Sequence, residues 1–139
     1  MFSRISDEAK WTKVLAEASK AVVALRLSNV RSFDSSFASC GQATGFVVDR
    51  ELGLILTNRH VVLVGPISAE AVFENHEGVV CQPIYRDPIH DFGFLKYDPS
   101  KVQYMDVGEL KLFPAGAKVG KEIRVLGNDA GEKIMVLRG

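Results

Sequence analysis

The stretch ATGFVVDRELGLILTNRHVV, residues 43–62, decides how the rest of this sequence is interpreted. Two runs rich in β-branched and aliphatic residues, 43–49 and 54–58, flank the polar segment RELG at 50–53. Short β-prone runs separated by a few turn residues are typical of a β-hairpin. The second run ends shortly before His60, so we expect this histidine just beyond the end of a strand.

Similar short runs continue the pattern on both sides of this hairpin. Further strands are expected at 21–27, 67–73, 79–85, 92–97, 122–128 and 133–138. The polar, serine-rich stretch 28–42 predicts a loop, and residues 75–78 and 129–132 predict turns. About seven short strands at close spacing predict an all-β antiparallel barrel or sandwich, preceded by a single helix.

Residues 7–20 predict that leading helix. Its apolar face repeats at helical spacing and consists of Trp11, Val14, Leu15 and Ala18. Asp7 and Glu8 would lie in the first turn, where negative charge suits the helix dipole, and Ser6 would cap it. We expect the apolar face of this helix to be laid on the barrel.

The composition narrows the class of protein. Hydrophobic residues make up 47% of the 139 residues and charged residues 24%, and 17 basic side chains balance 17 acidic ones. We expect no nucleic-acid or membrane partner, because the chain has no net charge and no apolar run of membrane-spanning length. The first residues lack the apolar core of a signal peptide, which favours an intracellular protein. The two cysteines, Cys40 and Cys81, are then expected to be reduced thiols.

Three motifs carry the candidate chemistry. His60 stands in LTNRHVV, Asp91 stands in YRDPIHDFGFLKY, and IRVLGN ends in a Gly-Asn turn at Gly127. A metal site formed by His60, Asp91, His76 and His90 is an alternative, but these residues lack a close-spaced ligand pair of the usual kind. Adjacent residues of an extended segment point to opposite faces, so we expect His90 to face solvent.

The remaining polar and glycine positions receive structural interpretations. His76 falls in a predicted turn and is assigned no role. Asp49, Asp87 and Asp98 are interpreted as solvated loop residues. Gly45 and Gly127 are expected to serve tight backbone geometry.

Together, the TGF, LTNRHVV, RDPIHDFGF and VLGN motifs resemble the HtrA/Do-like branch of the trypsin-like serine proteases, and especially the large Do-like proteins of fungi and plants. The resemblance runs from about Trp11 to Lys133. It implies the first β-barrel of a chymotrypsin fold, with His60 as general base and Asp91 orienting its imidazole. A serine hydroxyl is a poor nucleophile at neutral pH and needs such a base.

The resemblance also implies a nucleophilic serine in a GxSGxP-like turn of a second barrel. The only serine after Asp91 is Ser100, which has no flanking glycine. We therefore expect no nucleophile in this chain, no proteolytic activity of the chain alone, and an amino-terminal fragment of a longer protease. The expected organisation is a helix at 1–20, a first barrel at 21–129, and the start of a second barrel, otherwise absent, at 130–139.

For the full-length relative, the resemblance implies a protein or peptide substrate, no cofactor or metal, and a location in the nucleus or cytoplasm. Two alternatives remain open. In the first alternative, the chain is a non-catalytic remnant that acts as a protein-binding or regulatory module. In the second, a separate chain supplies the serine. A lone barrel exposes the apolar face that normally packs on its partner barrel, and such faces favour a protein partner or self-association.

Overall fold

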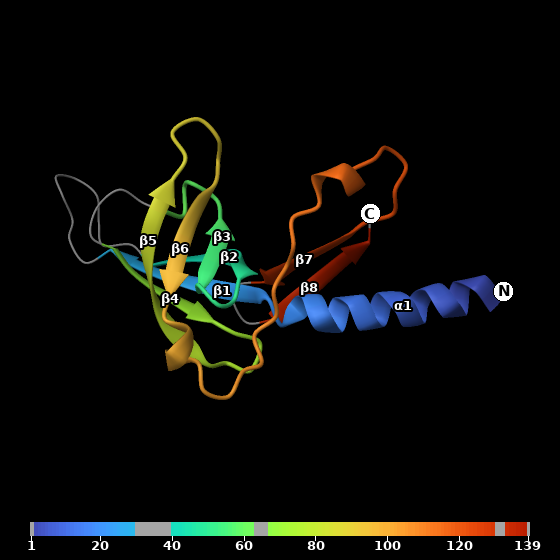
Figure 1. The fold of residues 1–139 in the computed structure, drawn as a ribbon, viewed down its shortest axis with the longest axis horizontal. Coiled ribbons are helices and arrows are strands. Elements are labelled where there is room, and N and C mark those ends of the chain that lie inside the picture. The colour runs from blue at the N-terminus through green and yellow to red at the C-terminus, as the bar shows by residue number, and fades with distance from the viewer. Residues whose placement is uncertain (1, 30–39, 63–66, 130–132, 139) are drawn as a thin grey trace.

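Six antiparallel strands close into a barrel, as the sequence predicts (Figure 1). The computed structural model describes residues 2–29, 40–62, 67–129 and 133–138. The strands are β1 (Val22–Asn29), β2 (Cys40–Asp49), β3 (Leu54–Thr57), β4 (Ile67–Val72), β5 (Gly78–Arg86) and β6 (Gly93–Tyr97). Their order around the barrel is β1-β2-β3-β6-β5-β4, so the predicted β2–β3 hairpin is confirmed.

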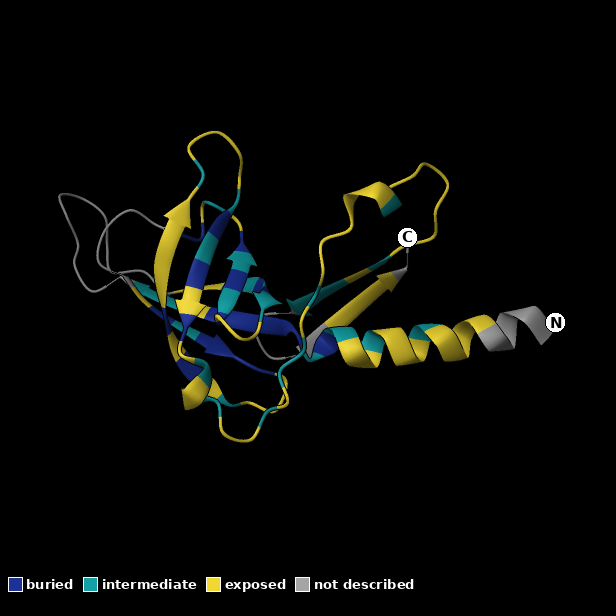
Figure 2. Cartoon of the chain, in the orientation of Figure 1, coloured by how far each residue is buried: buried dark blue, intermediate teal, exposed yellow. Residues whose placement is uncertain are grey.

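The barrel interior is filled by alternate residues of the strands, as the two-residue period of a strand requires (Figure 2). Its largest fully buried side chains are Leu25, Ile55, Leu95, Val23, Val47 and Cys81. Gly45 lies where β2 passes this core, and a Cβ there would be 2.7 Å from Ile55 Cγ2. Tight packing around Gly45 is thus confirmed, whereas the same expectation for Gly127 is wrong, because a Cβ there would meet nothing within 4 Å.

The two cysteines differ in what the structure describes of them. The Cys81 side chain is buried and free, and burial raises the pKa of its thiol to about 11. Cys40 begins β2, but its side chain lies outside the described residues. The expectation of reduced thiols is therefore confirmed for Cys81 alone.

Carboxylates organise the turns that leave the barrel strands. Asp49 Oδ1 accepts hydrogen bonds from the backbone N–H groups of Glu51 and Leu52, at 3.0 and 2.9 Å. Asp98 Oδ1 accepts from Ser100 N and Ser100 Oγ, at 3.0 and 2.7 Å. Asp98 is exposed, as predicted, and Asp49 is half-buried, but both side chains do more than face solvent, because each replaces a backbone acceptor within its turn.

A separate two-stranded sheet follows the barrel. It pairs β7 (Arg124–Asp129) with β8 (Lys133–Arg138), and among the described residues β7 has no ladder to a barrel strand. The strand expected at 122–128 therefore exists but lies outside the closed barrel, a correction to its expected place within the first barrel. The expected domain boundary at residue 129 falls between these paired strands and stays a prediction.

The leading helix, α1 (Phe2–Ser19), starts earlier than predicted and projects away from the barrel (Figure 1). Because the helix begins at Phe2, Ser6, Asp7 and Glu8 lie inside it, so the expected cap at Ser6 and the expected acidic first turn are both wrong. Val14 is 54% exposed, and the Trp11 ring contacts the Arg124 guanidinium, 4.3 Å from the ring centroid to Cζ. The expectation that this face covers the barrel is wrong, since Trp11 contacts β7.

No helix in the described part of the chain is long and apolar enough to cross a membrane.

Glu77 joins the β4–β5 turn to the segment that follows the barrel. Its carboxylate accepts the backbone N–H groups of Gln103 and Tyr104, the latter at 3.0 Å, and the Asn75 amide at 3.2 Å. The Gln103 bond, followed by the Asn75 and Tyr104 bonds, holds the pKa of Glu77 below its ordinary value of 4.5, although desolvation opposes the shift. The ionised carboxylate therefore stabilises the fold.

We expect Glu77→Gln to weaken the acid sensitivity of the fold. A carboxyl with a lowered folded-state pKa stabilises above its unfolded value, here 4.5, and this contribution is lost as the pH falls through the lower folded value. The variant should unfold at lower urea concentration than the wild type at pH 7, and the difference should shrink below about pH 4. Glu51→Gln is the control, because no hydrogen bond of its carboxylate exists among the described residues. An equal pH dependence of the urea midpoint in wild type and Glu77→Gln would contradict this role.

Candidate active site

The barrel topology brings His60 and Asp91 to one edge. His60 lies in the turn directly after β3, and Asp91 lies in the connection that leads into β6. β3 and β6 are antiparallel neighbours, and Thr57 at the end of β3 pairs with Gly93 at the start of β6. The residues after one strand must therefore lie beside those before the other, at the end of the barrel where the β5–β6 connection lies in Figure 1.

The His60 imidazole is hydrogen-bonded to the Asp91 carboxylate. Nδ1 lies 3.0 Å from Oδ2 and 3.1 Å from Oδ1, and the His60 backbone N–H also donates to Oδ1 at 3.1 Å. Buried Val61 and Val62 anchor the turn, because their N–H groups donate to the carbonyls of Asn58 and Arg59 at 3.1 and 3.0 Å. The buried valines therefore hold in place the backbone of the turn that carries His60.

The environment keeps Asp91 ionised. Desolvation alone would raise its pKa, but hydrogen bonds from the His60 backbone and imidazole, with the charge of His60, hold it below its ordinary value of 3.8. A carboxylate at Nδ1 favours the tautomer that carries its proton there, which leaves Nε2 as an acceptor. No hydrogen bond of Nε2 exists within the described residues, and the His60 side chain is 73% exposed. The imidazole can therefore take a proton from an approaching group.

A second carboxylate shapes the connection that carries Asp91. Asp87 Oδ1 accepts from the backbone N–H groups of Ile89 and His90, at 2.9 and 2.6 Å, and Oδ2 accepts from the Tyr85 hydroxyl at 3.1 Å. The His90 N–H, followed by that of Ile89, lowers the pKa of Asp87 below 3.8. Its side chain is only 13% exposed, so the prediction of a solvated Asp87 is wrong.

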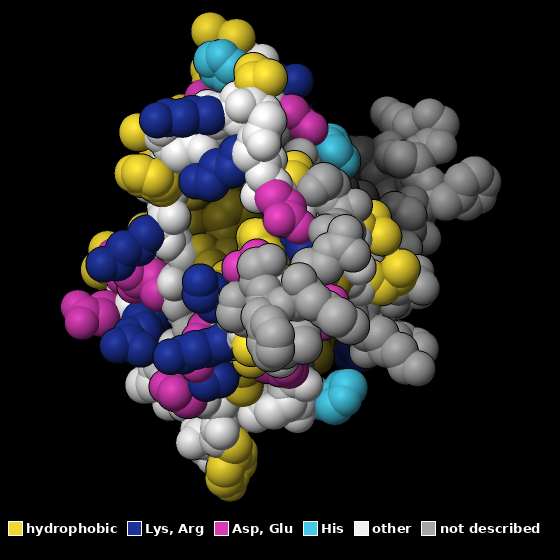
Figure 3. Space-filling model, turned by 90° about the vertical axis from the view of Figure 1, so that its right-hand side faces the viewer, with side chains coloured by type: hydrophobic (Ala, Val, Ile, Leu, Met, Phe, Trp, Pro, Cys, Tyr) yellow, Lys and Arg dark blue, Asp and Glu magenta, His cyan; other side chains and the backbone are white. Residues whose placement is uncertain are grey.

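The other histidines stand apart from this pair. His90 is exposed, as predicted, although residues 88–91 form bends rather than an extended segment, and its Nδ1 lies 3.3 Å from Asp87 Oδ1. His76 lies in the β4–β5 turn, as predicted, with a positive φ of 66°. The histidines are separated in the space-filling view, and no group of three His, Cys, Asp or Glu residues that could hold a metal occurs in the described part of the chain (Figure 3).

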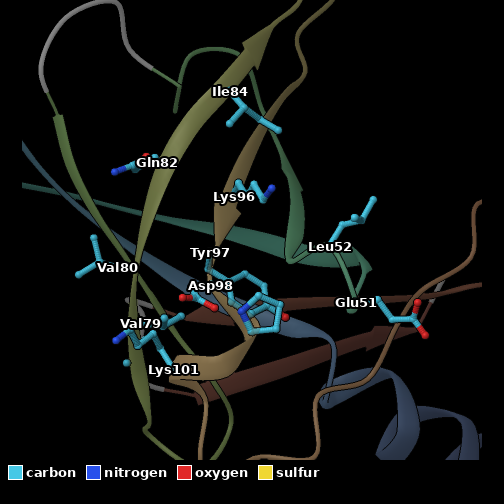
Figure 4. Close-up of a pocket in the computed structure, with 12 residues that line it drawn as sticks. Glu51, Leu52, Val79, Val80, Gln82, Ile84, Lys96, Tyr97, Asp98 and Lys101 are labelled. Carbon is cyan, nitrogen blue, oxygen red and sulfur yellow. The ribbon is translucent and has the colours of Figure 1, made fainter.

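A groove lies elsewhere, on the outside of the barrel (Figure 4). Its volume is about 880 Å³, and Val80 and Ile84 of β5, Lys96 of β6 and Leu52 of the β2–β3 turn contribute to its lining. Neither His60 nor Asp91 lines it. The candidate chemistry therefore lies outside this groove, on side chains exposed at the barrel edge.

Two polar residues beside the histidine, Asn58 and Arg59, belong to the site but were not among the predicted site residues. Asn58 Nδ2 lies 3.2 Å from Asp91 Oδ2, and Arg59 Nη1 donates to the Pro88 carbonyl at 3.0 Å. Their position in LTNRHVV was the available signal, because polar residues next to a candidate site histidine at a strand end can reach the same neighbouring loop as that histidine.

Residues 43–139 match the family model described as the trypsin-like peptidase domain. The chain belongs to the trypsin-like peptidases. The "Pro-apoptotic serine protease NMA111" of Kluyveromyces lactis is 55% identical over 99% of the chain, and a PDZ domain-containing protein of Schizosaccharomyces pombe is 53% identical over 97%. The chain spans 14% of the length of each of these two relatives.

Solved structures agree with this assignment at the level of the fold. The HtrA-type protease AlgW, solved with a tripeptide, superposes with a TM-score of 0.73 at 19% identity, over 93% of this trypsin-like chain and 38% of AlgW. The HtrA-type protease AlgW with a decapeptide gives 0.69 at 18% identity. The expected first barrel of a trypsin-like protease is therefore confirmed.

Proposed function

We propose that His60 and Asp91 form the general-base half of a serine-type endopeptidase site. The observation that carries this proposal is the bond from His60 Nδ1 to the ionised Asp91 carboxylate, on a histidine whose side chain is exposed. His60 Nε2 removes the proton of a serine hydroxyl as it attacks the peptide carbonyl, and later delivers that proton to the leaving amine. Asp91 holds the tautomer and stabilises the imidazolium.

We propose that the serine comes from polypeptide outside these 139 residues. In the described part of the chain no serine hydroxyl bonds to His60, and Ser100 Oγ donates to Asp98 instead. The K. lactis relative, named a serine protease, is about seven times longer than this chain, which supports the proposal. The substrate is a protein or peptide, and the chemistry requires no cofactor. The location is the nucleus or cytoplasm, and a fluorescent fusion of the protein would test that location.

A fluorophosphonate probe tests this function, because it labels serines that a neighbouring base activates. We expect no labelling of this chain alone. The reconstituted peptidase, defined as this chain joined in frame to the rest of the K. lactis peptidase domain, should be labelled at one serine, and His60→Ala should abolish the label. Labelling of the isolated chain at a serine, or equal labelling of the His60→Ala variant, would contradict the proposal.

The β7–β8 sheet favours a second candidate function, that of a non-catalytic protein-binding module. Its strands expose Val125, Met135, Val136 and Leu137 by 43–59%. Sedimentation of the isolated chain distinguishes the candidates. A binding module should sediment as a defined complex, either with itself or with a protein partner, and should still do so when His60→Ala removes the base.

A further inference from the structure

We propose that Asn58 is the positioning residue that fixes the orientation of the Asp91 carboxylate toward His60. The inference rests on the proposed function, because it assigns Asn58 a part in the same site. Asn58 Nδ2 lies 3.2 Å from Asp91 Oδ2 and 3.4 Å from the Asp91 carbonyl oxygen, so one amide contacts both the side chain and the main chain of that residue.

The two oxygens of Asp91 have different anchors. Oδ1 accepts the backbone N–H of His60, and Oδ2 accepts both the Asn58 amide and His60 Nδ1. Without Asn58 the only side-chain donor to this carboxylate among the described residues would be the imidazole itself, and the carboxylate could rotate about its Cβ–Cγ bond as the ring moves, since that torsion is broad. The Asn58 amide is a donor from a residue other than the histidine, so it fixes the rotation independently and keeps the carboxylate directed at His60 Nδ1.

The backbone places Asn58 where it can do this. The preceding residue, Thr57, is buried and its hydroxyl donates to the Thr44 carbonyl at 2.9 Å, while the Asn58 carbonyl accepts the Val61 N–H at 3.1 Å. The guanidinium of the next residue, Arg59, donates to the Pro88 carbonyl, so no arginine side chain of the described residues bonds to the carboxylate. An uncharged donor thus contacts Asp91, which fixes its orientation without adding a cation that competes with the imidazole.

Removal of the amide should change the titration of Asp91. A hydrogen bond to the charged form lowers the pKa of a carboxyl, so its loss raises that pKa. Asn58→Ala should therefore move the Asp91 midpoint upward, and Asn58→Asp, which keeps the shape but places a like charge beside Asp91, should move it further. The other titratable groups near Asp91 are His60 and Arg59, after β3, and Asp87 and His90, in its own connection, and all remain in both variants.

The test is a carbon-13 NMR titration of the aspartate and glutamate carboxyl carbons in the full 139-residue chain, with circular dichroism to confirm folding at each pH. Asn58 is exposed, so its replacement spares the core. Asn75→Ala is the matched control, because its amide contacts Glu77 Oε2 at the same 3.2 Å. It should move the Glu77 midpoint and leave Asp91 unchanged. An Asp91 midpoint that is the same in wild type, Asn58→Ala and Asn58→Asp overturns the inference.

Failure of this inference is distinguishable from failure of the proposed function. In the reconstituted peptidase, Asn58→Ala should lower kcat about tenfold with little change in KM, as expected for loss of a hydrogen bond to a charged group. If the wild-type reconstituted peptidase binds no fluorophosphonate, the proposed function fails, whatever Asn58 does. If it is labelled but neither kcat nor the Asp91 titration responds to Asn58, only the positioning role fails.

Discussion

Asp91→Asn is expected to lower kcat/KM of the reconstituted peptidase about 10⁴-fold, and His60→Ala at least as much. In the wild type, His60 Nδ1 lies 3.0 Å from a carboxylate oxygen of Asp91. The asparagine keeps the size of Asp91 but can present its amide N–H to Nδ1. The imidazole then favours the tautomer with its proton on Nε2, which cannot accept the proton of serine. Initial rates on a fluorogenic peptide measure the loss.

Asp87→Asn is the matched control for this experiment. Asp87 also lies beside a histidine in the same connection, but it accepts the N–H groups of Ile89 and His90, and asparagine can keep those bonds. The control should retain activity within about tenfold. A reconstituted peptidase in which Asp91→Asn and Asp87→Asn lose activity equally would show that Asp91 acts only through folding of the connection.

Leu95→Ala should produce the largest loss of stability, about 2–5 kcal/mol of unfolding free energy. Leu95 is fully buried on β6, between β3 and β5, and its removal leaves a cavity that the closed barrel cannot collapse to fill. Urea unfolding followed by circular dichroism measures the change. Leu52→Ala, at a side chain that is 55% exposed, is the control and should cost less than about 1 kcal/mol. A similar loss for both would contradict the barrel core described above.

The strands and the His60–Asp91 pair were accessible from sequence because their signals are local. Valine-rich runs of strand length predicted β1, β2 and β5. The motifs LTNRHVV and RDPIHDFGF marked the two segments that carry His60 and Asp91. What remained to be determined depended on tertiary packing. Trp11 repeats with its apolar neighbours on one face of α1, but periodicity does not reveal that its partner is Arg124.

The carboxylates show where local signals were present but interpreted too simply. Asp87 and Asp98 each precede proline, a combination typical of turns in which the aspartate side chain accepts backbone N–H groups. Those bonds are local and were predictable. The position of Asn58 beside His60 was a local signal, but its contact with Asp91 was not, because that contact joins residues on different loops that the β3–β6 pairing brings together.

The most direct test of the account is the tautomer of His60, measured in the isolated chain by long-range proton–nitrogen NMR at pH 8. Because Asp91 accepts from Nδ1, we predict that the neutral ring carries its proton on Nδ1 and that Nε2 is unprotonated. Asp91→Asn should reverse this preference, whereas Asp87→Asn should leave it unchanged. A ring that carries its proton on Nε2 in the wild type, or one that does not respond to Asp91→Asn, would contradict the claim that these residues form the base of a serine peptidase.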